Sequence, residues 1–240
     1  MIGLGGESSL YIHSNSNIVL TTSKDDSQIL SEIKKKKLSI LPMPNEKIIG
    51  SVRNEIVKSQ FYKKSSKKIN FLFIKSNSAH YDNIDDLALK IFVKSAKKFD
   101  KEINFQIKDR YKKKSEIVKQ MLKDNLITKK NIVDNKEIFI EKSIINSDIC
   151  VGTCSSALTK QAFWMKKPII QLFRQKLYGD QFKSAMAANS EKELDLILKN
   201  LLKRKYLSKR ILEAKKTYKK LYLTNQNPVK NFYKYLSNVL

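Results

Sequence analysis

The sequence predicts an α/β fold in which a parallel sheet is flanked by helices, and two observations lead to this prediction. From about residue 69, short apolar runs alternate with amphipathic segments, the order typical of βαβ units. The run INFLFI at 69–74 is apolar at nearly every position, as expected of a strand buried on both faces of a sheet. Hydrophobic residues make up 41% of the 240 residues, which is typical of a globular protein with a core.

The elements of this sheet follow one another along the chain. After the strand at 69–74, apolar residues from Ile84 to Phe99 recur at helical spacing. Asp85 and Asp86 lie near the start of that helix, where carboxylates interact favourably with the helix dipole. The next elements are a strand at 103–107, a helix from about 115, a short strand at 131–134, a helix at 138–146, a strand at 149–152, a helix at 156–165 and a strand at 168–173.

Three further helices are expected toward the C-terminus. Ser190 and Glu193 form an S-x-x-E capping box ahead of a leucine-rich amphipathic segment. A second helix is expected to begin near Ser208, and a third at Asn227–Pro228, a good N-cap followed by a good first-turn residue. The apolar stripe of this last helix is expected to pack against residues 1–50.

The first part of the chain is less periodic. It suggests a strand at 17–22, a helix at 25–33 and a strand at 38–41, after which Pro42 and Pro44 interrupt the pattern. Such a stretch is too short to form a domain alone. We therefore interpret 1–58 as the remnant of an N-terminal domain with its linker, and 59–240 as the main domain.

The charge and the cysteines limit the class of protein. The net charge is +25, and only five of the 48 basic residues are arginine, so lysine is spread over the chain as an A/T-rich genome would encode it. Nucleic acid binding is disfavoured because no RNA motif, zinc-finger spacing or arginine cluster is present, while a contact with an anionic membrane surface stays open. Cys150 and Cys154 have no second Cys or His pair, so neither a metal site nor a disulfide framework is expected.

No apolar run approaches the ~18–20 residues that span a bilayer, and the first residues lack the basic and apolar regions of a signal peptide. We therefore expect a cytoplasmic protein, which contacts the inner membrane at most at its periphery. No cofactor is expected.

The loop at 152–156 is the strongest candidate for a binding site. A strand ends at Gly152, a small-residue loop follows, and a helix begins at once, so backbone N–H groups and the positive helix end would face a phosphate. Gly152 permits close backbone approach, and Thr153, Ser155 and Ser156 offer hydroxyl donors. The alternative is that a serine merely caps the helix. No G-x-S-x-G elbow is present, so Ser155 is not expected to be a nucleophile.

Two other strand ends are expected at the same edge of the sheet, since ligands of open parallel sheets bind at the carboxyl ends of the strands. Lys75 and Ser76 follow the first strand, and Lys108 and Arg110 follow the second. The three basic side chains can pair with phosphate, Arg110 in bidentate fashion. In so lysine-rich a chain, each single lysine has the alternative of being solvated surface.

These residues resemble a known family. The pattern SD-I-x-VGTxSSALxxxA…KKPII, after a strand that ends in IKxR, is similar to the C-terminal domain of GT-B glycosyltransferases, above all bacterial surface and capsular carbohydrate enzymes. CDP-glycerol glycerophosphotransferases and UDP-sugar 2-epimerases share this half. Upstream, the run 50–53 (GSVR) resembles the family's GxxR segment at the domain crossover. The resemblance covers about residues 15–240 and is most specific at 146–171.

The resemblance implies a Rossmann-like domain that holds a donor nucleotide, with the diphosphate at 152–156. It implies a nucleotide-sugar such as a UDP- or CMP/CDP-linked donor as substrate, a glycan or lipid-linked acceptor, and an N-terminal domain or partner chain that supplies the acceptor chemistry. This chain departs from the family twice. Lys108-Asp109-Arg110 replaces a His-Pro pair, and a Glu on the helix after the loop falls on Lys160 or Gln161. We include Gln161 among the nucleotide-binding candidates.

Three hypotheses follow. The first is a glycosyltransferase, or a fragment of one, for surface polysaccharide or glycan biosynthesis. Its catalytic residue is not identified, with His80 and His13 as weak candidates for the base. The second is an inactive or accessory nucleotide-binding module that needs a partner chain. The third is a basic protein that binds nucleic acid or a membrane surface.

Overall fold

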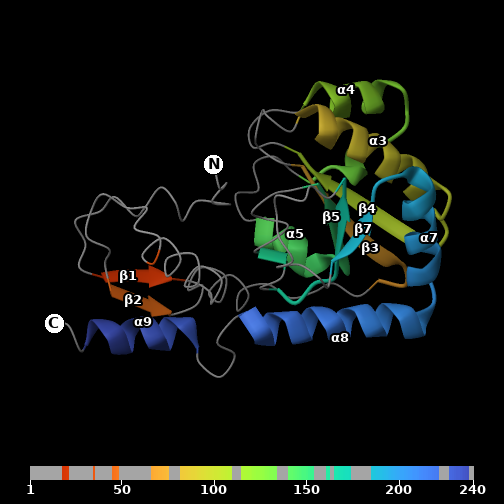
Figure 1. Cartoon of the computed structure of the whole chain (residues 1–240). Coiled ribbons are helices and arrows are strands. Elements are labelled where there is room, and N and C mark those ends of the chain that lie inside the picture. The colour runs from red at the N-terminus through yellow and green to blue at the C-terminus, as the bar shows by residue number, and fades with distance from the viewer. Residues whose placement is uncertain are drawn as a thin grey trace.

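The computed structural model describes residues 18–21, 35, 45–48, 66–75, 82–109, 115–133, 140–153, 161–162, 165–173, 185–221 and 227–237. Its main feature is a five-stranded sheet in the order β4-β3-β5-β6-β7, with every pairing parallel (Figure 1). The strands are β3 (Ile69–Ile74), β4 (Ile103–Lys108), β5 (Ile149–Gly152), β6 (Ile169–Leu172) and β7 (Met186–Ala188). The predicted parallel α/β fold is therefore confirmed.

Helices cover both faces of this sheet. They are α3 (Asp82–Lys97), α4 (Glu116–Lys123), α5 (Ile140–Asn146), α7 (Glu191–Leu201) and α8 (Arg204–Leu221). One core cluster joins the sheet to α3, α4 and α7, and a second joins its other face to Ile144 and Ile145 of α5 and Tyr218 of α8. The helices thus form layers on both sides of the sheet, as is typical of doubly wound α/β domains.

β3 is the centre of the core. Phe71 and Phe73 face the cluster of α3, while Leu72 and Ile74 face the opposite cluster, and all four side chains are at most 2% exposed. The ring of Phe92 on α3 lies 5.5 Å from that of Phe73 and 6.3 Å from that of Phe71, measured between centroids. The continuous apolar run at 69–74 therefore marks a strand buried on both faces, as predicted.

Two predicted helix starts are built as the sequence indicates. The Oγ of Ser190 accepts a hydrogen bond from the Glu193 backbone N–H (3.3 Å), while the Glu193 carboxylate accepts from the N–H of Asn189 (2.7 Å), one residue before the expected partner. At the start of α9 (Pro228–Leu236), Asn227 Oδ1 accepts from the N–H of Val229 (2.9 Å). Both helices are thus stabilised by side-chain caps.

Three other elements differ from the sequence-based expectation. The strand expected at 131–134 is a 3₁₀ turn at Lys129–Asn131 followed by one bridge between Ile107 and Ile132, because the Asn131 side chain bonds the chain at Thr128 and Phe105. β7 was not predicted, since its three residues, one methionine and two alanines, are too few to show a periodicity. α8 begins at Arg204 rather than near Ser208, so its basic first turn is helical as well.

In the N-terminal part, β1 (Ile18–Thr21) pairs in parallel with β2 (Asn45–Ile48), separately from the main sheet. β1 was predicted and β2 was not. The helix expected at 25–33, the strand at 38–41 and the domain boundary at 58/59 lie outside the described residues. α9 lies on the same side of the molecule as β1 and β2 in Figure 1, and its packing against that segment stays a prediction.

Phe92→Ala is expected to lower the free energy of unfolding by about 3–5 kcal/mol, because it removes a ring that contacts β3 and β4 inside the core. Urea denaturation followed by circular dichroism measures this change. The matched control is Leu87→Ala on the same helix, whose side chain is 50% exposed. If Phe92→Ala lowers the free energy of unfolding no more than Leu87→Ala does, the described packing of α3 on the sheet is contradicted.

Candidate functional site

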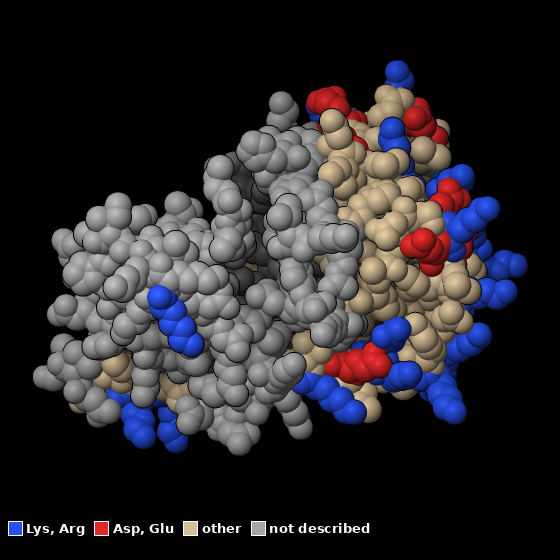
Figure 2. Space-filling view, in the orientation of Figure 1, with Lys and Arg blue, Asp and Glu red and all other residues tan. Residues whose placement is uncertain are grey.

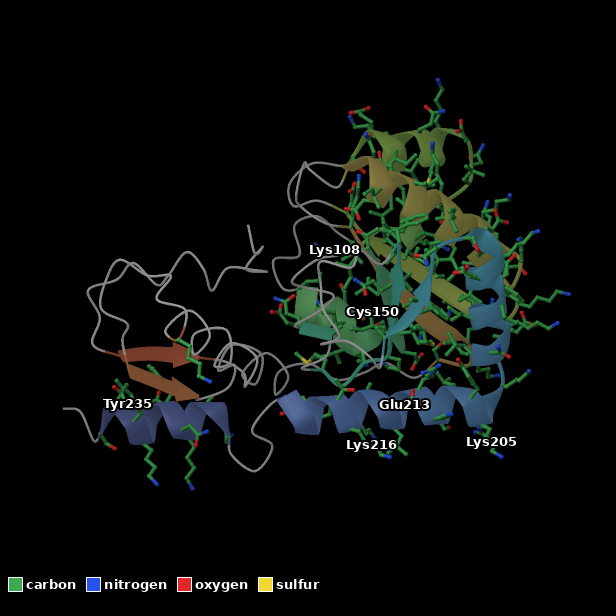
Figure 3. All side chains as sticks on the ribbon, viewed as in Figure 1. Lys108, Cys150, Lys205, Glu213, Lys216 and Tyr235 are labelled. Carbon is green, nitrogen blue, oxygen red and sulfur yellow. The ribbon has the colours of Figure 1, made fainter. Side chains whose placement is uncertain are left out.

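The carboxyl ends of β4, β3 and β5 meet at one edge of the sheet. Ile74 is in register with Lys108, and Phe73 is in register with Val151, so the three strands end at nearly the same level. The backbone N–H of Lys75 donates to the carbonyl of Lys108 (3.1 Å), which joins the first residues beyond β3 to the end of β4. The prediction that the strand ends Ile74, Ile107 and Gly152 lie at one edge is confirmed. The binding roles of Lys75, Lys108 and Gly152 stay predictions; Figure 3 labels Lys108 at this edge.

Lys75 lies at this edge but is already in an ion pair. Its side chain is almost fully buried, and its Nζ lies 2.5 Å from the Oδ1 of Asp86 on α3. Burial without a partner would be costly for an ammonium group, so the contact with Asp86 offsets the cost of burying Lys75. A phosphate group that binds Lys75 must therefore compete with a carboxylate.

Thr153 is held by Asp85 of α3, the residue before Asp86. Its hydroxyl donates to the Oδ1 of Asp85, and both side chains are at most 3% exposed. The hydroxyl predicted to bind phosphate thus anchors the start of the loop to α3.

Gln171 is a residue that the sequence analysis missed. It lies in β6 directly opposite Gly152. Because glycine has no side chain, a ligand can approach the backbone at this position. Gln171 is 2% exposed, and its Nε2 has no hydrogen-bond partner among the described residues. A buried amide donor without an acceptor is costly unless a ligand or water satisfies it. The signal in the sequence was one polar residue inside the apolar run at 168–173.

Gln161 is one of the two positions, with Lys160, on which the Glu of the resembled family falls. Gln161 and Ala162 are helical, and Gln161 Nε2 donates to Oε1 of Glu141 on α5 at 3.4 Å. Glu141 is fully buried. A carboxylate is thus present on this face of the sheet, but it comes from a different helix and is bonded to the glutamine.

The second departure from the family pattern also has a structural role. Asp109 is 3% exposed, and its Oδ2 accepts a hydrogen bond from the N–H of Ser115 (2.6 Å), ahead of α4. The carboxylate thus fixes the chain where α4 begins. Lys108 beside it is buried as well, at 7% exposure, and has its own interaction partner. Neither side chain is the solvated surface group of the alternative reading.

The remaining candidates lie outside the described residues: Ser76, His80, Arg110, Ser155, Ser156 and His13. Their roles stay predictions. In the described part of the chain, no group of three His, Cys, Asp or Glu residues is arranged to hold a metal ion, and no helix is long and apolar enough to cross a membrane.

A large hollow of about 840 Å³ lies at the opposite end of the sheet. It includes Asn70, Asn104 and Asn131 near the amino ends of β3 and β4. These amides are hydrogen-bonded within the fold, Asn104 to Asn70 at 3.2 Å and Asn131 to the carbonyl of Phe105 at 3.1 Å. The hollow is therefore lined by structural contacts and lies away from the strand ends described above.

The comparisons with known proteins concern the fold. No family model matches the chain, and no curated protein matches its sequence. The pneumococcal O-GlcNAc transferase GtfA, in complex with UDP and GlcNAc, is 14% identical with a TM-score of 0.54, over 93% of this chain and 44% of that chain. The wall teichoic acid polymerase TagF is 12% identical with a TM-score of 0.57, over 90% and 55%. The S. aureus MnaA–UDP structure is 14% identical with a TM-score of 0.55, over 94% and 61%.

At these identities the likeness shows the fold alone. The chain is an α/β protein with a Rossmann-like parallel sheet, as the sequence predicts, and it shares this fold with the matching part of these GT-B glycosyltransferase structures. It spans about half the length of the three proteins that it matches.

Cys150, two residues before Gly152, is expected to be inert in the folded chain. Burial raises the pKa of its thiol from 9.0 to about 11, although Ser147 and Lys167 act in the opposite direction. In a Cys154→Ser variant, the remaining thiol should resist dithionitrobenzoate at pH 8 and react in urea. Because the folded pKa is the higher one, this thiol stabilises the fold below pH 9, and the stabilisation is lost as the pH rises toward 11. Rapid native reaction would show that β5 is not buried as described.

Proposed function

We propose that the chain is the donor-nucleotide half of a glycosyltransferase that uses a nucleotide-activated sugar in surface polysaccharide or glycan biosynthesis. The observation that supports it most is the junction of Gly152 with Gln171. There a residue without a side chain faces a buried amide donor at the carboxyl edge of a parallel sheet, the usual ligand edge of such sheets. The fold of GtfA, TagF and MnaA, two of them solved with UDP, supports a nucleotide as the ligand.

In this proposal the diphosphate lies over Gly152 and the loop up to Ser156. The backbone N–H groups of the loop and of the helix predicted after it donate hydrogen bonds to the phosphate oxygens. Lys75 turns from Asp86 toward the phosphate. Lys108, the last residue of β4, adds positive charge, and Arg110, two positions further along the sequence, is predicted to add more. Together these groups offset the charge that develops on the nucleoside diphosphate as the sugar departs.

The donor class that we propose is a UDP- or CMP/CDP-linked sugar. Gln161, bonded to the buried Glu141, is the group closest in position to the glutamate of the resembled family. An amide can both donate to and accept from a hydroxyl, so Gln161 is suited to a ribose or sugar hydroxyl. The acceptor, a glycan or a lipid-linked sugar, and the catalytic base are assigned to an N-terminal domain or a partner chain. We place this activity in the cytoplasm at the inner face of the membrane.

A second candidate function is an accessory nucleotide-binding module. Two features favour it: Lys75 is paired with Asp86, and the family's Glu falls on Lys160 or Gln161, neither of which is a carboxylate. Such a module would bind the nucleotide without transferring the sugar. Hydrolysis or transfer of a UDP-sugar by this chain, alone or with a partner, separates the two functions.

Gly152→Val is expected to abolish UDP binding, because its two methyl groups would project from the end of β5 into the space through which the backbone must approach the phosphate. Isothermal calorimetry measures the affinity, and circular dichroism verifies that the variant is folded. The control Lys36→Ala, in the remote lysine run, should bind UDP as the parent does. Binding by a folded Gly152→Val chain at the parent's affinity would place the phosphate elsewhere and leave Gly152 as a turn residue.

Lys75→Ala and Asp86→Asn are expected to change UDP affinity in opposite directions. Lys75→Ala removes a charge-assisted hydrogen bond worth about 1.5–3 kcal/mol, so affinity should fall roughly tenfold or more. Asp86→Asn removes the competing carboxylate, so affinity should rise. The same calorimetric titration, with UDP and with uridine as a ligand without phosphate, measures both effects. If the two variants bind UDP equally, the ion pair is structural and Lys75 does not contact the nucleotide.

A further inference from the structure

The positive charge of the described helices is unevenly distributed. α8 has eight basic residues and one acid, a net charge of +7, and α9 has two lysines and no acid. By contrast, α3 has three lysines and three aspartates, and α7 has two lysines and three acids. A lysine-rich composition alone would raise the charge of every helix, so it does not account for the excess on α8 and α9.

The lysines of α3 and α8 also differ in their partners. Lys94 on α3 lies 2.9 Å from the carboxylate of Glu191, and Lys98, just beyond the end of α3, lies 2.7 Å from it. Hydrogen bonds to Asp195 and Glu191 raise the pKa of Lys98. On α8 the single acid, Glu213, is bonded to Arg210 at 2.7 Å. The outward lysines of α8 therefore have no carboxylate of their own helix to neutralise them.

These lysines form one exposed stripe. Lys205, Lys209, Leu212 and Lys216 are exposed and follow one another at spacings of three or four, while Ala214 and Tyr218 on the opposite side are buried. Lys205 and Lys216 extend from α8 away from the sheet in Figure 3, and Lys and Arg lie along the lower edge of the molecule, over α8 and α9, in Figure 2.

Large apolar groups are exposed among these charges. Leu212 in the middle of the stripe is 53% exposed, and Tyr233 on α9, between Lys230 and Lys234, is 66% exposed. Lysines beside exposed leucine and tyrosine are the composition of helices that lie in a membrane interface, where the apolar groups enter the headgroup boundary and the ammonium groups meet lipid phosphates. We call the exposed residues Lys205, Lys209, Leu212, Lys216, Lys230, Tyr233 and Lys234 the basic face.

We propose that the basic face of α8 and α9 holds the protein against an anionic lipid bilayer. The inference goes beyond sugar transfer, because it concerns where the protein is bound and uses none of the residues assigned to the nucleotide. Charge complementarity identifies the partner: unpaired ammonium groups on one surface match phosphate-bearing headgroups. Nucleic acid is a poorer match, since the basic residues of this face are lysines and Arg204 is the one exposed arginine of α8, whereas base edges are read best by several arginine forks.

The test is sedimentation of the full 240-residue chain with vesicles of phosphatidylcholine alone or with 30% phosphatidylglycerol at about 0.1 M salt. We expect binding to the anionic vesicles only, weakening at 0.5 M salt, where charges are screened within a few Å. Lys205→Glu/Lys216→Glu should lower the binding constant by about thirtyfold or more. Each lysine removed from the surface costs about fivefold in affinity, and each glutamate added is repelled by the anionic lipid.

The substitutions are chosen to leave α8 folded. Lys205→Glu places an acid in the first turn, where the helix dipole favours it, and at the i,i+4 spacing from Lys209 that favours an ion pair; Lys216→Glu replaces an exposed side chain. The matched control is Lys90→Glu/Lys192→Glu, which makes the same change of net charge at exposed positions on α3 and α7. Leu212→Ser/Tyr233→Ser should weaken vesicle binding severalfold at unchanged charge.

Equal loss in both charge-reversed pairs would show that net charge, and not the basic face, determines binding, and would overturn the proposal. So would equal binding of neutral and anionic vesicles, or tight binding of an RNA oligonucleotide that the α8 pair abolishes while vesicle binding is unaffected. The α8 pair should keep the parent's affinity for UDP, so a failure of the membrane proposal is distinguishable from a failure of nucleotide binding.

Discussion

Burial of β3 on both faces is the constraint on which the rest of the domain depends. A strand with Phe71 and Phe73 on one side and Leu72 and Ile74 on the other must be covered by helices on both sides and paired at both edges. Parallel pairing with β4 and β5 then requires crossover helices, and these determine the direction of every strand. Since all the strands run the same way, their carboxyl ends meet at one edge. The location of the site therefore follows from the apolar pattern of one strand.

The same topology also brings α3 to that edge, because the helix after β3 begins where the strand ends. Its first turns carry Asp85 and Asp86, which interact favourably with the helix dipole and, in the structure, hold Thr153 and Lys75. The carboxylates therefore order the edge in the absence of ligand, yet they place negative charge beside a site that we assign to a diphosphate. This arrangement favours a ligand that can exchange one anion for another at Lys75 over one that merely adds charge.

The sequence predicted the fold well where an element is long and periodic, and less well elsewhere. Strand 69–74 and the helix from Asp82 follow directly from apolar spacing. β7 could not be found, because a methionine and two alanines are too few residues to show a period. The turn at Asn131 depends on a side-chain hydrogen bond to Phe105, far along the chain. At the site, the convergence of strand ends followed from the parallel topology. The pairing of Lys75 with Asp86 could not be predicted from the sequence. The spacing of residues in a helix indicates which of them share a face, but it does not indicate which distant side chain each of them contacts.

The net charge illustrates the same limit. Counted along the sequence, lysine is spread over the whole chain and indicates only a biased composition. The structure separates lysines that face carboxylates on α7 from those on α8 that face solvent. Like charges four residues apart, such as Lys205 and Lys209, destabilise a helix, so α8 is less stable alone than a helix with alternating charges. An anionic surface would remove that repulsion for all of these lysines at once. The charge of α8 is thus better matched to a bound than to a free state of the protein.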